Sequence, residues 1–298
     1  MTIAVDYPAP PRVQAGLPLA IVAFGGSLTG FSGILVRLSE VDPLATGGWR
    51  MAIAIIAFLP FFRLAAGSAG SHSRLRLTPI LALAGLFFAI DMAFYNWSLQ
   101  LTSVAHATLI VNLAPVVALA AGFLMFGERF GPAKATGLVA ALGGAAIMTL
   151  MRADGSGTLA GNGLAALGML GYAFYLVAVK RACRDHDTFS IMVWSSIVTC
   201  VLMFGVAALM GERLLPASAN GWLVLIGLGL VSHVFGQGLV AYGMRGAPVG
   251  LASILLLTQP VVATISAWVF FDETMGPVEA AGAALVLAGL VIASRARA

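Results

Sequence analysis

Charged side chains are scarce in this 298-residue sequence: Lys, Arg, Asp and Glu make up only 9% of it, whereas 60% of residues are hydrophobic. Soluble domains carry roughly a quarter charged residues to cover their surface, so the scarcity excludes that class. Cysteine is scarce too. Cys183 and Cys200 are too few for a disulfide framework or a thiolate metal site. With a mean hydropathy of +0.99, the chain is predicted to be an integral membrane protein.

Motifs that carry chemistry are also lacking. The sequence has no Walker A loop, no H-E-x-x-H, no G-x-S-x-G and no DNA-binding motif. We therefore expect no cofactor, no metal site, no direct use of ATP and no nucleic-acid partner. An intramembrane enzyme would need a nucleophile, base or metal cluster that we do not find, so we expect no enzymatic activity. We also expect no Lys or Arg deep in a span, which disfavours strongly anionic cargo.

Long apolar runs are what the sequence does have. Each of ten runs can cross roughly 30 Å of hydrocarbon as a helix. They cover residues 17–38, 43–64, 78–100, 103–126, 131–151, 160–181, 188–210, 220–243, 248–271 and 276–294. A transmembrane barrel would need alternating polarity instead, so the predicted class is an all-α membrane protein. The first run lacks the features of a cleaved signal peptide and is read as a retained span.

Basic residues between the runs predict the orientation. With the N-terminus inside, twelve basic residues face the cytoplasm and four (Arg37, Arg50, Arg152 and Arg213) face outside. This positive-inside bias places both termini in the cytoplasm of a multi-pass plasma (cell inner) membrane protein.

The chain repeats itself. "FGERFGP" at 126–132 matches "FDETMGP" at 271–277, a shift of 145 residues that also places Pro115 on Pro260 and Trp49 on Trp194. We predict two five-helix repeats, 1–151 and 152–298. Since five is odd, the second repeat enters the membrane from the opposite side, as in the inverted-topology repeats of many secondary transporters. The glutamates of the two heptapeptides, Glu128 and Glu273, are expected at structural corners, near the N-terminal ends of the helices that follow them.

These matching segments, with the ten spans and the five-plus-five duplication, resemble the drug/metabolite transporter superfamily in its EamA-type branch. Within that branch the sequence is similar to the YddG-type aromatic amino acid exporters, by overall likeness and without a diagnostic motif. The resemblance implies a transporter of small metabolites, acting outward in many members.

Proline and glycine mark candidate bends. Pro115 and Pro260 lie near the middles of their spans, where each removes a backbone N–H and kinks the helix. Gly26 and Gly30 allow close packing or hinge motion. Symmetric placement favours a functional bend at the two prolines, although a purely structural kink remains open. For the two glycines close packing is favoured, and hinge motion that serves gating is the alternative.

Asp91 is the only carboxylate deep within a predicted span. Tyr95 and Ser98 follow at i+4 and i+7 on the same helix face. Asp91 could couple protons, balance a substrate ammonium or accept a structural hydrogen bond, because intramembrane carboxylates are functional candidates by default. Asn96 and Trp97 lie on other faces of the same helix and could contact the substrate from there.

The equivalent span of the second repeat offers His233 and Gln237 one turn apart, and Tyr242, which the repeat aligns with Trp97. A histidine can titrate near neutral pH, although a lone His on a helix is more often a satisfied bundle residue.

Neutral amides and aromatics complete the candidate substrate site. Asn112 and Gln259 precede the two prolines and could donate to a carboxylate or accept from an ammonium. Tyr172 and Tyr175 add aromatic surface that could stack a bulky side chain, or simply pack.

Together these features predict an exporter of small metabolites, most plausibly amino acids with aromatic or hydrophobic side chains, acting by alternating access through a central cavity. Another small metabolite or drug, moved in either direction, is the alternative. Expected partners are the substrate and membrane lipid. Small-residue stripes in 134–144 and 279–289 suit tight helix contact, either as a scaffold or in a homodimer.

Overall fold

The computed structural model describes residues 16–66, 76–102, 104–128, 131–150, 158–271 and 276–295, and within these ranges it contains helices and no strand. Ten helical segments there are long and apolar enough to cross a membrane, and each overlaps one predicted run. The all-α prediction with ten spans is confirmed. Glu273 of the second heptapeptide lies outside the described residues.

Six spans are each a single helix. These are α3 (Pro43–Ala66), α4 (Pro79–Leu101), α7 (Pro132–Leu150), α8 (Leu159–Ala182), α9 (Thr188–Met210) and α14 (Pro277–Arg295). Prolines begin four of them, at a position where the missing N–H has no helical partner to lose.

Four spans are interrupted. They are built from α1 (Gly16–Gly30) with α2 (Ser32–Arg37), α5 (Val104–Val111) with α6 (Ala114–Phe126), α10 (Ala219–Gly227) with the π-helix η2 (Leu228–Gln237) and α11 (Gly238–Gly243), and α12 (Val249–Leu255) with α13 (Thr258–Phe271). The breaks between α5 and α6 and between α12 and α13 stand just before Pro115 and Pro260. The predicted proline bends are therefore real interruptions of two equivalent spans.

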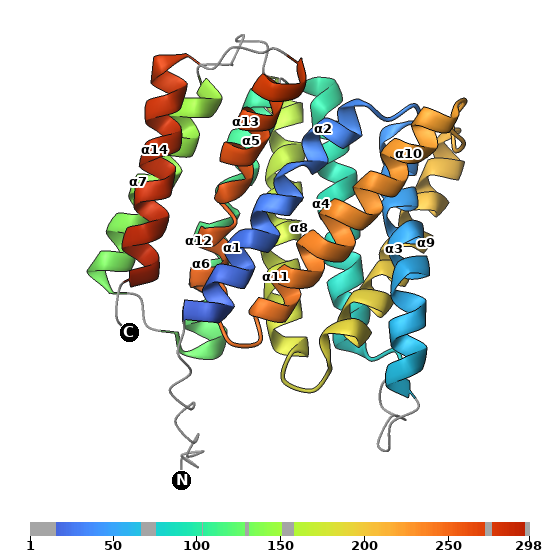
Figure 1. The fold of residues 1–298 in the computed structure, drawn as a ribbon, viewed down its shortest axis with the longest axis horizontal. Helices are drawn as coiled ribbons and strands as arrows, with labels where there is room; N and C mark the ends of the chain where they lie inside the picture. Colours follow the sequence, from blue (N-terminus) through green and yellow to red (C-terminus); the bar gives the residue numbers. More distant parts are fainter. Residues whose placement is uncertain are drawn as a thin grey trace.

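The two repeats run in opposite directions. In Figure 1, α1 rises from the lower face of the bundle, whereas α8, which begins the second repeat, descends toward it. The first repeat's last helix, α7, rises, and its equivalent α14 descends beside it. As a result, α1 begins and α14 ends at the same face.

Helix packing follows the same pseudo-two-fold relation. Equivalent spans pack on each other: α7 packs on α14, α3 on α9, and α6 of the fourth span on α12 of the ninth, while α4 packs on α8 and α1 on η2 and α11. The α7–α14 contact depends on glycine: a Cβ on Gly137 would lie 2.7 Å from the backbone of Gly289, and one on Gly144 would lie 2.4 Å from Gly282. The small-residue stripes are thus used within the chain, and the homodimer stays a prediction.

Glu128 forms a corner between the repeats. Its Oε1 accepts from the Val249 N–H at 2.7 Å and its Oε2 from the Gly250 N–H at 3.0 Å. The expectation of a structural corner is confirmed, but the helix it serves is α12, not the adjacent α7. Sequence proximity suggested α7; the fold instead brings the unpaired N–H groups of α12 to the carboxylate.

The connection before α3 meets the one after α9 at the opposite face. Glu40 accepts from the Ala217 and Ser218 N–H groups, both at 2.9 Å, and Glu212 accepts from Ala45 N at the start of α3, also at 2.9 Å. Carboxylates therefore tie the two repeats together at both faces of the bundle.

Candidate substrate site

An aromatic stack crosses the centre of the bundle. The Phe88 ring of α4 lies 4.5 Å from the Tyr175 ring of α8 and 5.6 Å from the His233 ring of η2, and Tyr172 lies 6.1 Å from Tyr175. All three contacts are stacked. Such pairs add about 0.5–1.5 kcal/mol beyond their area burial, so the stack is a stable apolar wall.

This stack lies on the axis that relates the repeats. Phe88 and His233 are separated by 233 − 88 = 145 residues, the repeat shift, and their rings touch. Side chains at equivalent positions of two repeats can meet only near the axis that relates them. The stack therefore marks the boundary between the halves, where inverted-repeat transporters place their substrate.

Glycines of α8 bring its aromatic side chains close to α4. A Cβ on Gly171 would lie 2.7 Å from the Asp91 N, and one on Gly168 would lie 3.1 Å from the Tyr95 N. Only helices lined by small residues approach this closely. The contact places Asp91 and Tyr172 on neighbouring helices at the same depth.

Arg50 is the functional candidate that the sequence analysis missed. It was placed at the outer end of its span, but the structure buries it to 8% exposure in the third turn of α3. Its Nη2 donates to the Ser232 carbonyl at 3.4 Å, and its guanidinium lies 5.8 Å from the Phe88 ring centroid. The expectation of no Lys or Arg deep in a span was wrong. The mean hydropathy of a long window stays high when a single charged residue is flanked by apolar residues. The sequence did contain a sign of this burial, because a helix that begins at Pro43 places Arg50 two turns inside the membrane span.

Asp91 shares this region with Arg50. Asp91 stands about one turn beyond Phe88 on α4, and the Arg50 guanidinium lies 5.8 Å from the Phe88 ring centroid. Asp91 is half-buried. In the described ranges it makes no direct ion pair with Arg50 and accepts no hydrogen bond.

Amide side chains converge on Tyr172. Gln259 Nε2 donates to the Tyr172 hydroxyl at 3.4 Å, and the Gln237 amide lies close to the same hydroxyl. Gln237 is 3% exposed and comes from η2, whereas Gln259 comes from the first turn of α13. Three spans thus contribute polar groups around one phenol.

Several buried polar atoms at this centre have no hydrogen-bond partner among the residues that the structure describes. They are Arg50 Nε, Ser232 Oγ, His233 Nδ1 and Gln237 Oε1. The other ring nitrogen of His233 bonds Ser196 Oγ at 2.9 Å. Unpaired buried polar atoms are costly and rare, so four together point to a site that a ligand or water completes.

The segment that carries three of these atoms is the π-helix η2. Wide π turns occur mostly as short insertions at functional sites. Its equivalent, α4, is a regular α-helix. The residue pattern of the sequence did not predict this difference between the two equivalent spans.

Tyr95 and Asn112 lie toward the break between α5 and α6. The Tyr95 hydroxyl is 3.5 Å from Thr108 Oγ1, and the Asn112 Nδ2, which stands in the break, is buried without a partner. Asp91, Tyr95, Tyr172, Tyr175, His233, Gln237 and Gln259 are therefore brought together around the centre, and Asn112 borders them.

Three other predicted site residues lie elsewhere. Asn96 Nδ2 donates to the Pro43 carbonyl at 3.0 Å and joins α4 to the start of α3. Trp97 packs edge-on against Phe94 at 5.9 Å, and Tyr242 is 56% exposed on the outer surface of α11. Their positions on the helix, not their chemistry, separate them from the centre.

The predicted glycines and prolines meet at the interruptions. A Cβ on Gly26 would lie 3.0 Å from Thr258 Oγ1, and one on Gly30 would lie 2.9 Å from the Gln259 carbonyl. Pro115 and Pro260 are both buried. Thus α1 crosses the α12–α13 break at close range, and its glycines are needed for that crossing.

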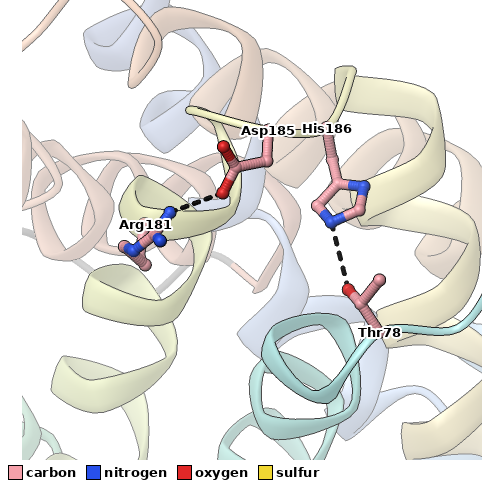
Figure 2. A network of polar contacts seen from close by, with 4 residues as sticks. All are labelled: Thr78, Arg181, Asp185 and His186. Carbon is pink, nitrogen blue, oxygen red and sulfur yellow. Dashed lines mark hydrogen bonds and ion pairs between the residues drawn. The ribbon is translucent and has the colours of Figure 1, made fainter. Parts of the chain in front are cut away.

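Figure 2 shows the connection between α8 and α9, which offers superficial metal ligands. Asp185 points to Arg181 at 2.6 Å, and His186 Nε2 turns toward Thr78 Oγ1 at 3.0 Å. Asp187 accepts from the Ser190 N–H and caps α9. Across the described residues, no group of three or more His, Cys, Asp or Glu side chains is placed to hold a metal.

Comparisons with known proteins identify relatives along nearly the whole chain. The model of the EamA-like transporter family matches twice, at residues 16–150 and 159–295. An uncharacterised transporter of Archaeoglobus fulgidus is 30% identical over 93% of this chain and 96% of its own. A probable terminal-alkyne amino-acid exporter of Streptantibioticus cattleyicolor is 26% identical over 94% and 92%. A crystal structure of a protein 22% identical, covering 94% of this chain and 98% of that one, has the same fold with a TM-score of 0.81.

Proposed function

We propose that this protein, which belongs to the EamA-like transporter family, exports small amino acids, with aromatic or hydrophobic side chains favoured. Transport would proceed by alternating access through the centre of the bundle. The observation that carries the proposal is the Phe88–His233 stack on the pseudo-two-fold axis, with unpaired polar atoms beside it. A relative named as an amino-acid exporter supports the same cargo class.

The centre combines the two surfaces such a cargo needs. The rings of Phe88, Tyr172 and Tyr175 provide an apolar wall for a bulky side chain. Arg50, Asp91 and the amides provide polar groups for the backbone portion of an amino acid. Because the stack lies between the repeats, a tilt of one half against the other would change which face reaches it.

The proposed orientation follows from the basic residues. With Arg50 in the interior, Arg37, Arg152 and Arg213 remain on the outer side, against twelve basic residues on the inner side. The bias thus strengthens the placement of both termini in the cytoplasm of the plasma membrane. We propose facilitated diffusion or ion-coupled antiport as the energy source, and no catalysed reaction.

Counterflow in proteoliposomes tests the proposal. Vesicles loaded with unlabelled phenylalanine should accumulate labelled phenylalanine, and leucine should follow with lower affinity. Phe88→Leu should weaken phenylalanine competition about twofold to tenfold, the worth of one aromatic contact. Phe123→Leu, at a ring that is 63% exposed, is the control and should leave flux unchanged. Absence of counterflow for every amino acid would reject the cargo class.

A further inference from the structure

Arg50 and Asp91 form an unusual charged pair. Arg50 stands on α3 with its guanidinium 5.8 Å from the Phe88 ring centroid, and Asp91 stands about one turn beyond Phe88 on the neighbouring helix α4. No direct bond joins the two charged side chains in the described part of the chain. A buried ion pair that serves only stability needs good geometry and further hydrogen bonds to offset its desolvation cost. This pair lacks both.

Each member keeps bonding capacity that the protein does not use. The guanidinium of Arg50 carries five N–H donors. Toward the described residues it makes one long hydrogen bond, of 3.4 Å to the Ser232 carbonyl, and its Nε has no partner among them. The half-buried Asp91 accepts no hydrogen bond from described residues. Among the described residues, this cation and this anion thus make no ion pair with each other.

The aromatic stack lies beside both charges. The Arg50 guanidinium lies 5.8 Å from the ring centroid of Phe88, which belongs to the stack, and the Asp91 backbone packs against Gly171, the residue before Tyr172. A molecule lying against these rings would therefore be within reach of the two charges at once. Such a molecule should be neutral overall, because the pair it meets has no net charge.

A zwitterionic α-amino acid fits these demands. Its carboxylate matches the planar fork of a guanidinium, which binds carboxylates through two parallel hydrogen bonds. Its ammonium would pair with a carboxylate. An amine or a carboxylic acid that carries only one of these groups would leave one buried charge of the protein without a partner.

We propose that Arg50 binds the carboxylate of the cargo and Asp91 its ammonium, so that the site selects zwitterions over amines and over carboxylic acids of the same shape. This assignment rests on the proposed amino-acid cargo and gives it a mechanism of recognition. The aromatic stack then contacts the side chain, while the charged pair recognises the part that all α-amino acids share.

Competition among three matched ligands tests the assignment: phenylalanine, 3-phenylpropionate, which lacks the ammonium, and 2-phenylethylamine, which lacks the carboxylate. Binding to purified protein is measured by thermal shift, and competition by counterflow of labelled phenylalanine. Phenylalanine should bind the unaltered protein at least about tenfold more tightly than either analogue, because a site built for two charged groups rejects ligands lacking one.

Two substitutions should redirect this preference. Asp91→Asn should favour 3-phenylpropionate relative to phenylalanine, and Arg50→Gln should favour 2-phenylethylamine. Arg181→Gln and Asp185→Asn are matched controls at an exposed pair, 45% and 61% accessible, and should leave the ranking unchanged.

The outcomes separate this inference from the function on which it rests. Equal binding of all three ligands to the unaltered protein would overturn the inference even if phenylalanine is transported and even if the variants fail to fold. An unchanged ranking in both folded variants would also overturn it. The expected ranking without any counterflow would support the charged recognition and reject the transport of amino acids.

Discussion

The corner formed by Glu128 allows a quantitative prediction. Its carboxylate accepts from Val249 N at 2.7 Å and from Gly250 N at 3.0 Å, and Lys180 acts on it electrostatically. All seven residues of α12, the helix that begins there, are buried. Glu128→Gln keeps the shape of the side chain but removes its charge and one of its two acceptor oxygens.

The expected loss follows from these two bonds. A hydrogen bond to a charged group contributes about 1.5–3 kcal/mol, and a negative charge at a helix N-terminus adds about 0.3–1 kcal/mol. Because glutamine retains one neutral acceptor, we expect a destabilisation of about 2–3 kcal/mol. In thermal unfolding of the detergent-solubilised protein, this corresponds to a fall in Tm of roughly 4–12 °C.

Asp185→Asn is the matched control. Its partner Arg181 lies at 2.6 Å, but both side chains are exposed, at 61% and 45%. Surface pairs of this kind contribute about 0–1 kcal/mol, so the control should lower Tm by less than about 4 °C. If Glu128→Gln lowers Tm no more than the control does, the corner does not stabilise α12 and the reasoning is refuted.

Two further predictions concern packing and pH. Gly137→Ala should destabilise the protein by about 1–3 kcal/mol in thermal unfolding, because its Cβ would lie 2.7 Å from the backbone of α14. Gly143→Ala, which meets nothing within 4 Å, should be neutral or stabilising, and equal effects would contradict the close packing. The hydroxyl and backbone N–H of Ser218 lower the pKa of Glu40 below 4.5. A lowered pKa stabilises the folded state above pH 4.5 and stops doing so as pH falls through the folded-state value. The Tm advantage of the unaltered protein over Glu40→Gln should therefore disappear in acid; an advantage independent of pH would exclude the carboxylate as its source.

Much of the candidate site was predictable because its polar residues interrupt apolar membrane spans. Asp91 interrupts an apolar span, and His233 and Gln237 do the same in the equivalent span of the second repeat. Since polar groups at membrane depth seek the bundle interior, their meeting around Tyr172 follows from residue type and depth together.

Other residues depended on direction around a helix, which no local pattern reports. Asn96 and Trp97 have the same depth as Tyr95 but contact the α3 start and Phe94 instead. Tyr242 occupies the position of the second repeat that is equivalent to Trp97, and its side chain is exposed on the surface. The position of a residue along the chain determines its depth in the membrane. The neighbour that its side chain faces depends on how the helices pack.

The sequence by itself determined the membrane, the ten spans and the inverted duplication, because apolar length and internal repetition are properties of the linear chain. Only the tertiary structure decided that Arg50 lies buried with its guanidinium against the Ser232 carbonyl, that Phe88 meets its repeat equivalent His233, and that Glu128 caps α12. Each of these contacts joins helices far apart in sequence. Such contacts arise only when the two repeats pack against each other around a common axis, and hydropathy contains no information about that packing.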